Sequence, residues 1–218
     1  MNPSPLEQLI ENNEAGAIET LLKEQAQLAS QTTTHGISPL LLAAYYERPD
    51  IAGIIADALP SLHLIEACAL GRFEDVTLAI YKYPEQLNEH GENGFTPLGT
   101  ACYFAHEEIV RFLIMKGADV NIASKNGYHV YPIHSAVAAN HLSITRLLFE
   151  AGAYPNVCQK SGMAPLHSAA ALGNIDLIIL LLEHGAEVGL RMEGGKLPAD
   201  LAAEKGFTEI AEILREDD

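Results

Sequence analysis

The sequence lacks several features that would point to particular classes of protein. It has no tryptophan, and its three cysteines (Cys68, Cys102 and Cys158) include no CxxC pair. A sparse, odd set of cysteines favours free thiols in a reducing compartment over a disulfide framework. The N-terminal residues have neither the basic start nor the apolar core of a secretory signal. The apolar run Leu177–Leu182 is far shorter than the ~20 residues that cross a bilayer. We therefore expect a cytoplasmic protein that does not bind a membrane.

Basic residues are also scarce. Thirteen Lys and Arg stand against 29 Asp and Glu, which gives a formal net charge of −16. Proteins that bind nucleic acids recruit Lys and Arg to neutralise phosphates, so this balance argues against a DNA or RNA partner. The acidity is concentrated toward the two ends of the chain. At the C-terminus, charged residues that include Glu216, Asp217 and Asp218 predict a solvated end unit.

No motif of a catalytic, cofactor or metal site is present in the sequence. Gly194-Gly195-Lys196 lacks the spacing and the following Ser or Thr of a phosphate-binding loop. There is no HExxH, no GxSxG and no pair of cysteines at metal-ligand spacing. His129 and His134 are five residues apart, but nothing supplies the further ligands that a metal needs. We therefore predict no enzyme activity, no cofactor and no metal.

What the sequence does contain is an internal repeat. Prolines at 97, 132, 165 and 198 are 35, 33 and 33 residues apart, and each is followed by a pair of small residues. The longer first spacing includes a two-residue insertion around Tyr128-His129-Val130. After a second apolar run, three units close on similar tracts that begin at Gly117, Gly152 and Gly185. A fixed period of this length is typical of proteins built from stacked units.

Each part of the repeat has a physical role. Ser38 and Thr96 can cap a helix N-terminus, while the proline that follows fills the first helical position, where no N–H is needed. The second helix has apolar residues at helical spacing, such as Ile144 and Leu148, which neighbouring units must cover. The glycine that opens each closing tract supplies the left-handed residue that ends this helix. One unit is therefore predicted to be helix–turn–helix followed by a hairpin loop.

This pattern resembles the ankyrin repeat over nearly the whole chain. The resemblance implies an all-α repeat solenoid of stacked helix–turn–helix units with short β-hairpin loops. It also implies that His134 and His167, at the motif histidine position, bond to the neighbouring loop. We predict a single solenoid domain over residues 1–218, with units at about 5–30, 36–60, 61–90, 91–123, 124–158, 159–192 and 193–218.

A longer repeat relates the first units to those that follow. With a shift of 58 residues, Leu6 aligns with Leu64, Gly36 with Gly94, and Pro39 with Pro97. Only 24 residues separate Pro39 from His63, nine fewer than the period. The segment 58–61 is therefore predicted to be too short for a hairpin loop.

The resemblance also implies where a partner binds. In ankyrin-like stacks, the concave face consists of loop tips and the exposed ends of the first helices. Half of the 14 aromatic residues fall at these positions, and aromatic side chains are favoured interface anchors. An alternative interpretation is that the rings cover neighbouring loops. The predicted partner-binding residues, including two polar positions of the loops, are Tyr45, Tyr46, Phe95, Tyr103, Phe104, Tyr128, Tyr131, His90 and Glu92.

Two functions remain open from the sequence. The first is a monomeric, non-enzymatic protein–protein interaction module, an adaptor or an inhibitor, that holds another protein or a peptide in an aromatic groove. The alternative is an acidic escort for a basic client protein, favoured by the net charge of −16 but not by the nearly neutral middle of the chain.

Overall fold

A computed structural model describes residues 3–215 and places nearly all of them in short helices joined by loops. The chain forms two compact units: unit 1 is Met1–Gln86 with Gly91–Asn93, and unit 2 is Leu87–His90 with Gly94–Asp218. Helix follows helix through both units, which confirms the predicted all-α repeat solenoid. The predicted end residues Glu216, Asp217 and Asp218 lie outside the described residues.

Unit 1 packs its helices around a continuous apolar core. Its elements are α1 (Pro5–Glu11), α2 (Ala15–Glu24), the 3₁₀-helix η1 (Ala26–Ser30), α3 (Pro39–Tyr45), α4 (Pro49–Ala58), α5 (Leu64–Leu70) and α6 (Phe73–Lys82). The first helix of each pair contacts the next first helix, α1 against α3 and α3 against α5. The core contains Leu6, Ile10, Ile18, Leu40 and Ile55, all without exposed surface.

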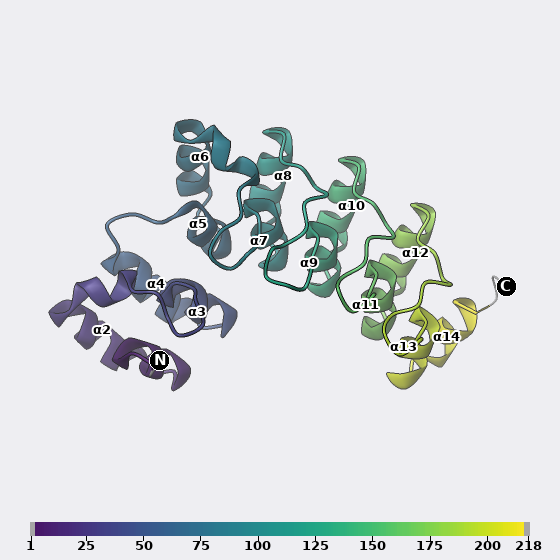
Figure 1. Ribbon diagram of the computed structural model, residues 1–218, viewed down its shortest axis with the longest axis horizontal. Coiled ribbons are helices and arrows are strands. Elements are labelled where there is room, and N and C mark those ends of the chain that lie inside the picture. The colour runs from purple at the N-terminus through teal and green to yellow at the C-terminus, as the bar shows by residue number, and fades with distance from the viewer. Residues whose placement is uncertain (1–2, 216–218) are drawn as a thin grey trace. The chain divides into compact units, whose positions relative to one another are not determined.

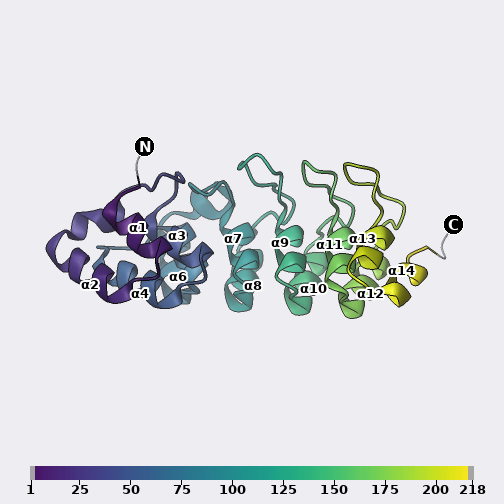
Figure 2. The same ribbon diagram turned by 90° about the horizontal axis from the view of Figure 1, so that it is seen from below.

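Unit 2 stacks four helix pairs side by side (Figure 1). After the 3₁₀-helix η2 (Pro84–Asn88), which enters it from unit 1, its helices are α7 (Pro97–Tyr103), α8 (Glu107–Met115), α9 (Pro132–Ala138), α10 (Leu142–Glu150), α11 (Pro165–Leu172), α12 (Ile175–Glu183), α13 (Pro198–Glu204) and α14 (Thr208–Ile213). The first helices α7, α9, α11 and α13 pack in a row. The loops that precede α9, α11 and α13 all project to the same side (Figure 2).

Helix starts are capped in two ways. The hydroxyls of Ser38 and Thr96 accept hydrogen bonds from the third helical residue, as predicted. Where the hydroxyl is missing, the side chain of the third helical residue accepts a hydrogen bond from the N–H of the residue before the helix. His134 Nδ1 accepts from the Tyr131 N–H, and His167 Nδ1 accepts from the Ala164 N–H. The N–H of the third helical residue, which has no hydroxyl to bind in these units, donates to the carbonyl of the residue before the helix, His134 to Tyr131 (2.9 Å) and His167 to Ala164 (3.0 Å).

The predicted register of the longer repeat is wrong by one residue in the first helix. Pro5–Glu11 and Leu64–Leu70 are related by a shift of 59, so Leu6 corresponds to Ile65 and not to Leu64. The shift is 58 from α2 and α6 onward. The cause is the turn between α1 and α2 (residues 12–14), which is one residue longer than the turn between α5 and α6 (71–72).

The loops differ in one detail from the predicted β-hairpins. In the loop before α3, the Thr33 N–H donates to the Ile37 carbonyl and the Gly36 N–H to the Thr33 carbonyl. In the loop before α11, the Gln159 N–H donates to the Met163 carbonyl and the Gly162 N–H to the Gln159 carbonyl. Residues 3–215 contain no β-strand, because loop residues such as Lys125 donate to a neighbouring loop rather than across their own. Between α4 and α5, the segment Leu59–His63 connects the helices directly, which agrees with the prediction that it is too short for a hairpin.

The structure shows the state of the three cysteines and the length and polarity of the helices. Cys68, Cys102 and Cys158 are free thiols, and burial raises the pKa of the Cys68 thiol. Within residues 3–215, every helix is too short or too polar to cross a membrane.

Histidine side chains connect neighbouring repeats in unit 2. Because Nδ1 of each ring already accepts a backbone hydrogen bond, Nε2 carries the proton and donates. His134 Nε2 donates to the Met163 carbonyl (3.1 Å), and His167 Nε2 donates to the Lys196 carbonyl (3.3 Å). The bonds to the neighbouring loop that the resemblance implied are confirmed. Burial lowers the pKa of His134 to about 4 and also lowers the pKa of His167, so both rings are neutral at pH 7.

Asparagine side chains form a second set of links between the repeats. Asn121 donates to the Gly152 carbonyl and accepts from the Tyr154 N–H. Asn156 makes the same pair of bonds one unit later, to Gly185 and Glu187. Each asparagine thus satisfies a carbonyl and an N–H that follow the second helix of the next unit.

Glycines allow adjacent loops to approach closely. Gly162 has φ +75°, and a Cβ there would lie 3.0 Å from the Cα of Met192 in the next loop. Gly194 also has a positive φ (+84°), but a Cβ there would meet no atom within 4 Å. The two positions therefore share the backbone constraint and differ in the space available.

We expect Gly162→Ala to destabilise the protein more than Gly194→Ala. Both variants meet the left-handed backbone cost of about 1 kcal/mol, and only Gly162→Ala adds an overlap of about 1–3 kcal/mol with the next loop. Urea unfolding of both variants measures the difference. Equal losses would show that the loops are not in contact at Gly162.

His134 is expected to make the stability sensitive to acid. The unfolded chain takes up a proton near pH 6.5, whereas the folded ring takes one up only near pH 4. The contribution of the neutral ring is thus complete above about pH 6.5, and roughly 3 kcal/mol is lost as the pH falls toward 4. Urea unfolding at pH 7 and pH 4.5 should show a smaller loss on acidification for His134→Gln than for the wild type. The same acid sensitivity in both proteins would contradict this role.

Candidate functional site

Three of the predicted partner-binding residues form an aromatic cluster at the end of α7 in unit 2. The Tyr103 ring lies 5.0 Å from the Phe104 ring in an edge-to-face arrangement and 6.3 Å from the Phe95 ring. Phe95 is buried, Phe104 is half-buried and Tyr103 is 44% exposed. Tyr103 therefore has an exposed surface and packs against the buried ring of Phe95.

Three further residues of the predicted set lie on the loops of unit 2. Tyr128, in the loop before α9, is 67% exposed. Tyr131 is half-buried, with its ring centre 5.8 Å from that of His134. His90 is half-buried, and its Nε2 lies 2.8 Å from the Ala123 carbonyl oxygen. Among these three, Tyr128 has the most surface available to a partner.

The remaining three predicted residues belong to unit 1. The hydroxyl of the half-buried Tyr45 accepts a hydrogen bond from Asn93 Nδ2 (3.0 Å). The neighbouring Tyr46 is 41% exposed, and Glu92 is exposed. The hydrogen bond attaches Tyr45, at the end of α3, to the short segment of unit 1 that contains Glu92.

Several exposed apolar side chains were not predicted. On α6, Leu78 and Tyr81 are each about two-thirds exposed, and in unit 2 Met115 and Tyr154 are 73% and 62% exposed. The sequence analysis assigned apolar residues of second helices to the buried face. The spacing of Leu78 and Tyr81, three residues apart, is the signal that could have indicated a second apolar face on α6.

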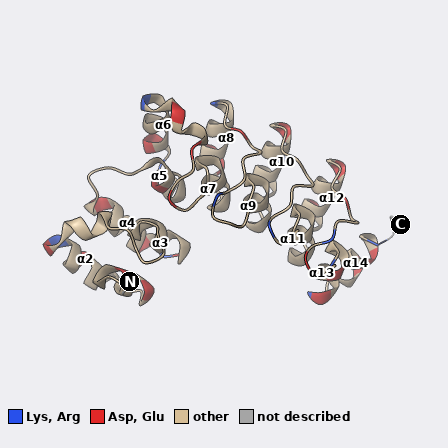
Figure 3. Ribbon diagram, viewed as in Figure 1, with Lys and Arg blue, Asp and Glu red and all other residues tan. Residues whose placement is uncertain are grey.

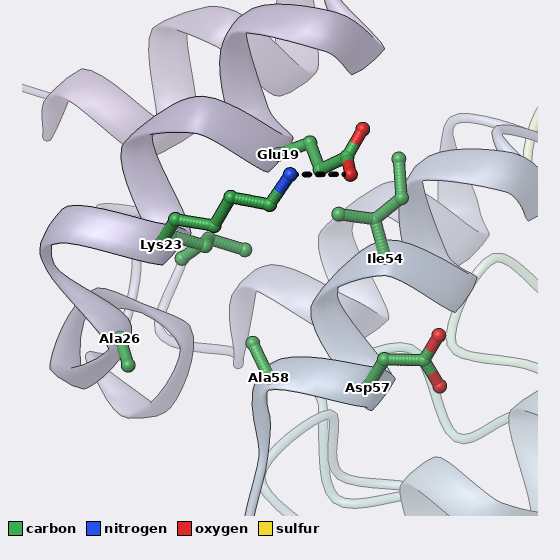
Figure 4. Close-up of a pocket in the computed structure, with 7 residues that line it drawn as sticks. Glu19, Lys23, Ala26, Ile54, Asp57 and Ala58 are labelled. Carbon is green, nitrogen blue, oxygen red and sulfur yellow. Dashed lines mark hydrogen bonds and ion pairs between the residues drawn. The ribbon is translucent and has the colours of Figure 1, made fainter.

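A hollow of about 320 Å³ lies between α2 and α4 in unit 1 (Figure 4). Its lining is mainly apolar, from Leu22, Ala26, Ile54 and Ala58. At its edge, Lys23 forms an ion pair with Glu19 (2.8 Å) one turn earlier on α2. None of the predicted site residues lines this hollow.

One group of side chains in unit 1 has the composition of a cation site. Ligand atoms of Glu7, Glu11 and His35 lie within 4.8 Å of one another. However, Glu7 is buried and its carboxylate already accepts from the Thr34 N–H (3.1 Å), the Thr34 hydroxyl and the Ser4 N–H. Burial by itself would raise the pKa of Glu7, and these hydrogen bonds hold it below its ordinary value. The arrangement fixes the loop before α3 onto α1.

Comparisons with known proteins agree with this architecture. The sequence model of the family "Ankyrin repeats (3 copies)" matches residues 64–157 and 133–218. The probable 26S proteasome regulatory subunit p28 of Saccharomyces cerevisiae is 29% identical over 166 residues, which are 70% of this chain and 72% of the yeast protein. The protein phosphatase 1 regulatory subunit 27 of Mus musculus is 39% identical over 69 residues, 32% of this chain and 43% of that protein.

Other relatives are much longer than this chain. The neurogenic locus notch homolog protein 2 of Homo sapiens is 32% identical over 155 residues, which are 66% of this chain but only 6% of that protein. The chain thus spans a tenth or less of the length of several curated relatives that it matches. Because the family model covers more than half of the sequence, the chain belongs to the ankyrin repeat family, whose repeats form protein–protein interaction modules.

Proposed function

We propose that this chain is a non-enzymatic adaptor or inhibitor that binds a partner protein through the first-helix ends and loops of unit 2. The observation that carries the proposal is the Tyr103 ring, which is 44% exposed and packed against two other aromatic rings. An aromatic side chain that is already fixed loses little conformational entropy when a partner covers it. Tyr and Trp in such settings are the residues that most often dominate binding energy.

In this proposal, the partner contacts the exposed residues of the predicted partner-binding set. In unit 2 these are Tyr103, Tyr128 and the half-buried Phe104. Phe95, Tyr131 and His90 position them, because their rings are buried or engaged inside the unit. In unit 1, Tyr46 and Glu92 offer a separate pair of exposed contacts.

The relatives support a regulatory role rather than a catalytic one. Two of them are named as regulatory subunits, one of the 26S proteasome and one of protein phosphatase 1. We infer that this chain likewise acts by occupying a surface of its partner. The three free thiols fit the reducing cytoplasm, and the charge of −16 disfavours nucleic acid as a partner. We expect the chain to be monomeric before it binds.

Replacing Tyr103 and Phe104 together by Ala should abolish capture of the partner and leave the melting temperature nearly unchanged. The rings would be lost from the binding surface, while the buried Phe95 would keep the core of the unit. Affinity purification followed by mass spectrometry compares the variant with the wild type. The matched control is Met115→Ala/Tyr154→Ala, which removes two exposed side chains elsewhere in unit 2 and should keep all partners.

Retention of every partner by Tyr103→Ala/Phe104→Ala would contradict the proposal. If that variant unfolds, the rings belong to the core, and the single change Tyr128→Ala becomes the test. Because the Tyr128 side chain is 67% exposed, its removal should weaken capture without unfolding the protein.

An acidic escort for a basic client is the second candidate, and the net charge of −16 favours it. Association driven by overall charge should slow steeply as salt rises, because the Debye length falls from about 30 Å at 0.01 M to about 8 Å at 0.15 M. Stopped-flow association with the captured partner distinguishes the two candidates. An escort should associate at least tenfold more slowly at the higher salt, whereas an aromatic contact should change little.

A further inference from the structure

Charge is segregated within unit 2. The first helices α9 and α11, with the loop tips before them, correspond to residues 122–141 and 157–174. These segments contain no Asp or Glu, and Lys125 and Lys160 are their only Lys or Arg. The acidic residues of 94–174 lie on the second helices or directly after them, at Glu107, Glu108, Asp119 and Glu150. The loops before α7 and α13 do contain acidic residues (Glu89, Glu92, Glu187 and Glu193), so red occurs on loops as well as on second helices in Figure 3. In a chain of net charge −16, the loop tips before α9 and α11 therefore carry only positive charge.

The two lysines are held on adjacent loops. The Lys125 N–H donates to the Gly94 carbonyl (2.7 Å), and the Lys160 N–H donates to the Tyr128 carbonyl (2.9 Å). Gly94 directly precedes Phe95, which packs against Tyr103. A continuous series of contacts thus connects the aromatic cluster to both lysines. We call Tyr103, Lys125, Tyr128, His129 and Lys160 the loop surface.

Neither lysine is neutralised within the described part of the chain. Both are exposed, and neither forms an ion pair among residues 3–215. Other cations of unit 2 do have partners, such as Arg111 with Glu107 and Lys196 with Glu204. The positive charge of the loop surface is therefore available to a ligand.

The insertion in the sequence lies on this surface and is ordered. The longer spacing between Pro97 and Pro132 adds residues to the loop before α9. The Tyr128 N–H donates to Asn126 Oδ1 (3.1 Å), and the Val130 N–H donates to Ser124 Oγ (2.9 Å). His129 has φ +55°, a conformation that non-glycine residues seldom adopt. The loop therefore holds an exposed tyrosine and an exposed histidine in one defined conformation.

We propose that the loop surface binds an extended acidic segment of the partner protein. Carboxylates of the segment pair with Lys125 and Lys160, and its apolar side chains contact Tyr103 and Tyr128. This inference rests on the proposed function and specifies the chemistry of the partner. A nucleic acid is also an anion, but two lysines supply few of the phosphate contacts that nucleic-acid binding requires, and the total charge opposes it. Lys125 and Lys160 also disfavour a basic client at these two loops.

The test uses fluorescence anisotropy with the full chain and three labelled probes. These are a 12-residue peptide of alternating Glu and Leu or Phe, the same peptide with Lys in place of Glu, and a 12-residue oligothymidylate. The Glu peptide should bind saturably, and the other two should not. In the variant Lys125→Glu/Lys160→Glu, affinity for the Glu peptide should fall at least about tenfold.

The matched control is Arg111→Glu/Arg146→Glu, which has the same net charge but is changed on the second helices α8 and α10. It should lose less than about twofold in affinity for the Glu peptide. Equal losses in both variants would mean that only total charge matters, and would overturn the proposal. Tighter binding of the Lys peptide or the oligothymidylate, or no binding of the Glu peptide up to about 1 mM, would also overturn it.

The same variants distinguish this inference from the proposed function. If Lys125→Glu/Lys160→Glu keeps a partner that Tyr103→Ala/Phe104→Ala loses, protein binding stands and the acidic segment is wrong. If Tyr103→Ala/Phe104→Ala keeps every partner, the aromatic surface is wrong whatever the peptides do.

Discussion

Each helix pair of unit 2 is too small to bury its own apolar side chains and must be covered by its neighbours. Leu98, Ile133 and Leu166 on successive first helices are buried in this way. Such packing is non-directional and by itself would allow neighbouring units to slide. His134 and His167, with Asn121 and Asn156, add directional bonds from each unit to a fixed carbonyl or N–H of the next. These bonds set the register of the loops.

The position of the binding surface follows from this register. Because the polar links and the loop-to-loop bonds hold the loops, the ends of the first helices face outward with little freedom. Tyr103 and Tyr128 are exposed from a fixed backbone, and Lys125 and Lys160 stand on loops tied to their neighbours. Segments 122–141 and 157–174 contain no Asp or Glu, and Lys125 and Lys160 are their only Lys or Arg in an acidic protein.

Much of the fold could be predicted from local features of the sequence. Proline after a capping residue marked the starts of α3 and α7, and the resemblance to the ankyrin repeat implied the bonds of His134 and His167 to the neighbouring loop. Features that depend on neighbours were harder to predict. Asn121 lies in the tract that begins at Gly117, but its bonds to the next unit depend on which residues lie close to it in the folded chain. The burial of Phe95 could not be predicted for the same reason, because the exposure of its side chain depends on which residues pack around it. The one-residue error in α1 arose because a turn length cannot be read from a regular shift.

Native-state hydrogen exchange at the backbone amides of Lys125, Lys160 and Glu193 tests the rigidity of the loop array most directly. Each of these amides donates to the neighbouring loop. The account predicts that they exchange slowly and only when the repeats open cooperatively. Exchange as fast as that of an unstructured peptide would show that the loops move independently, and would contradict a preformed binding surface.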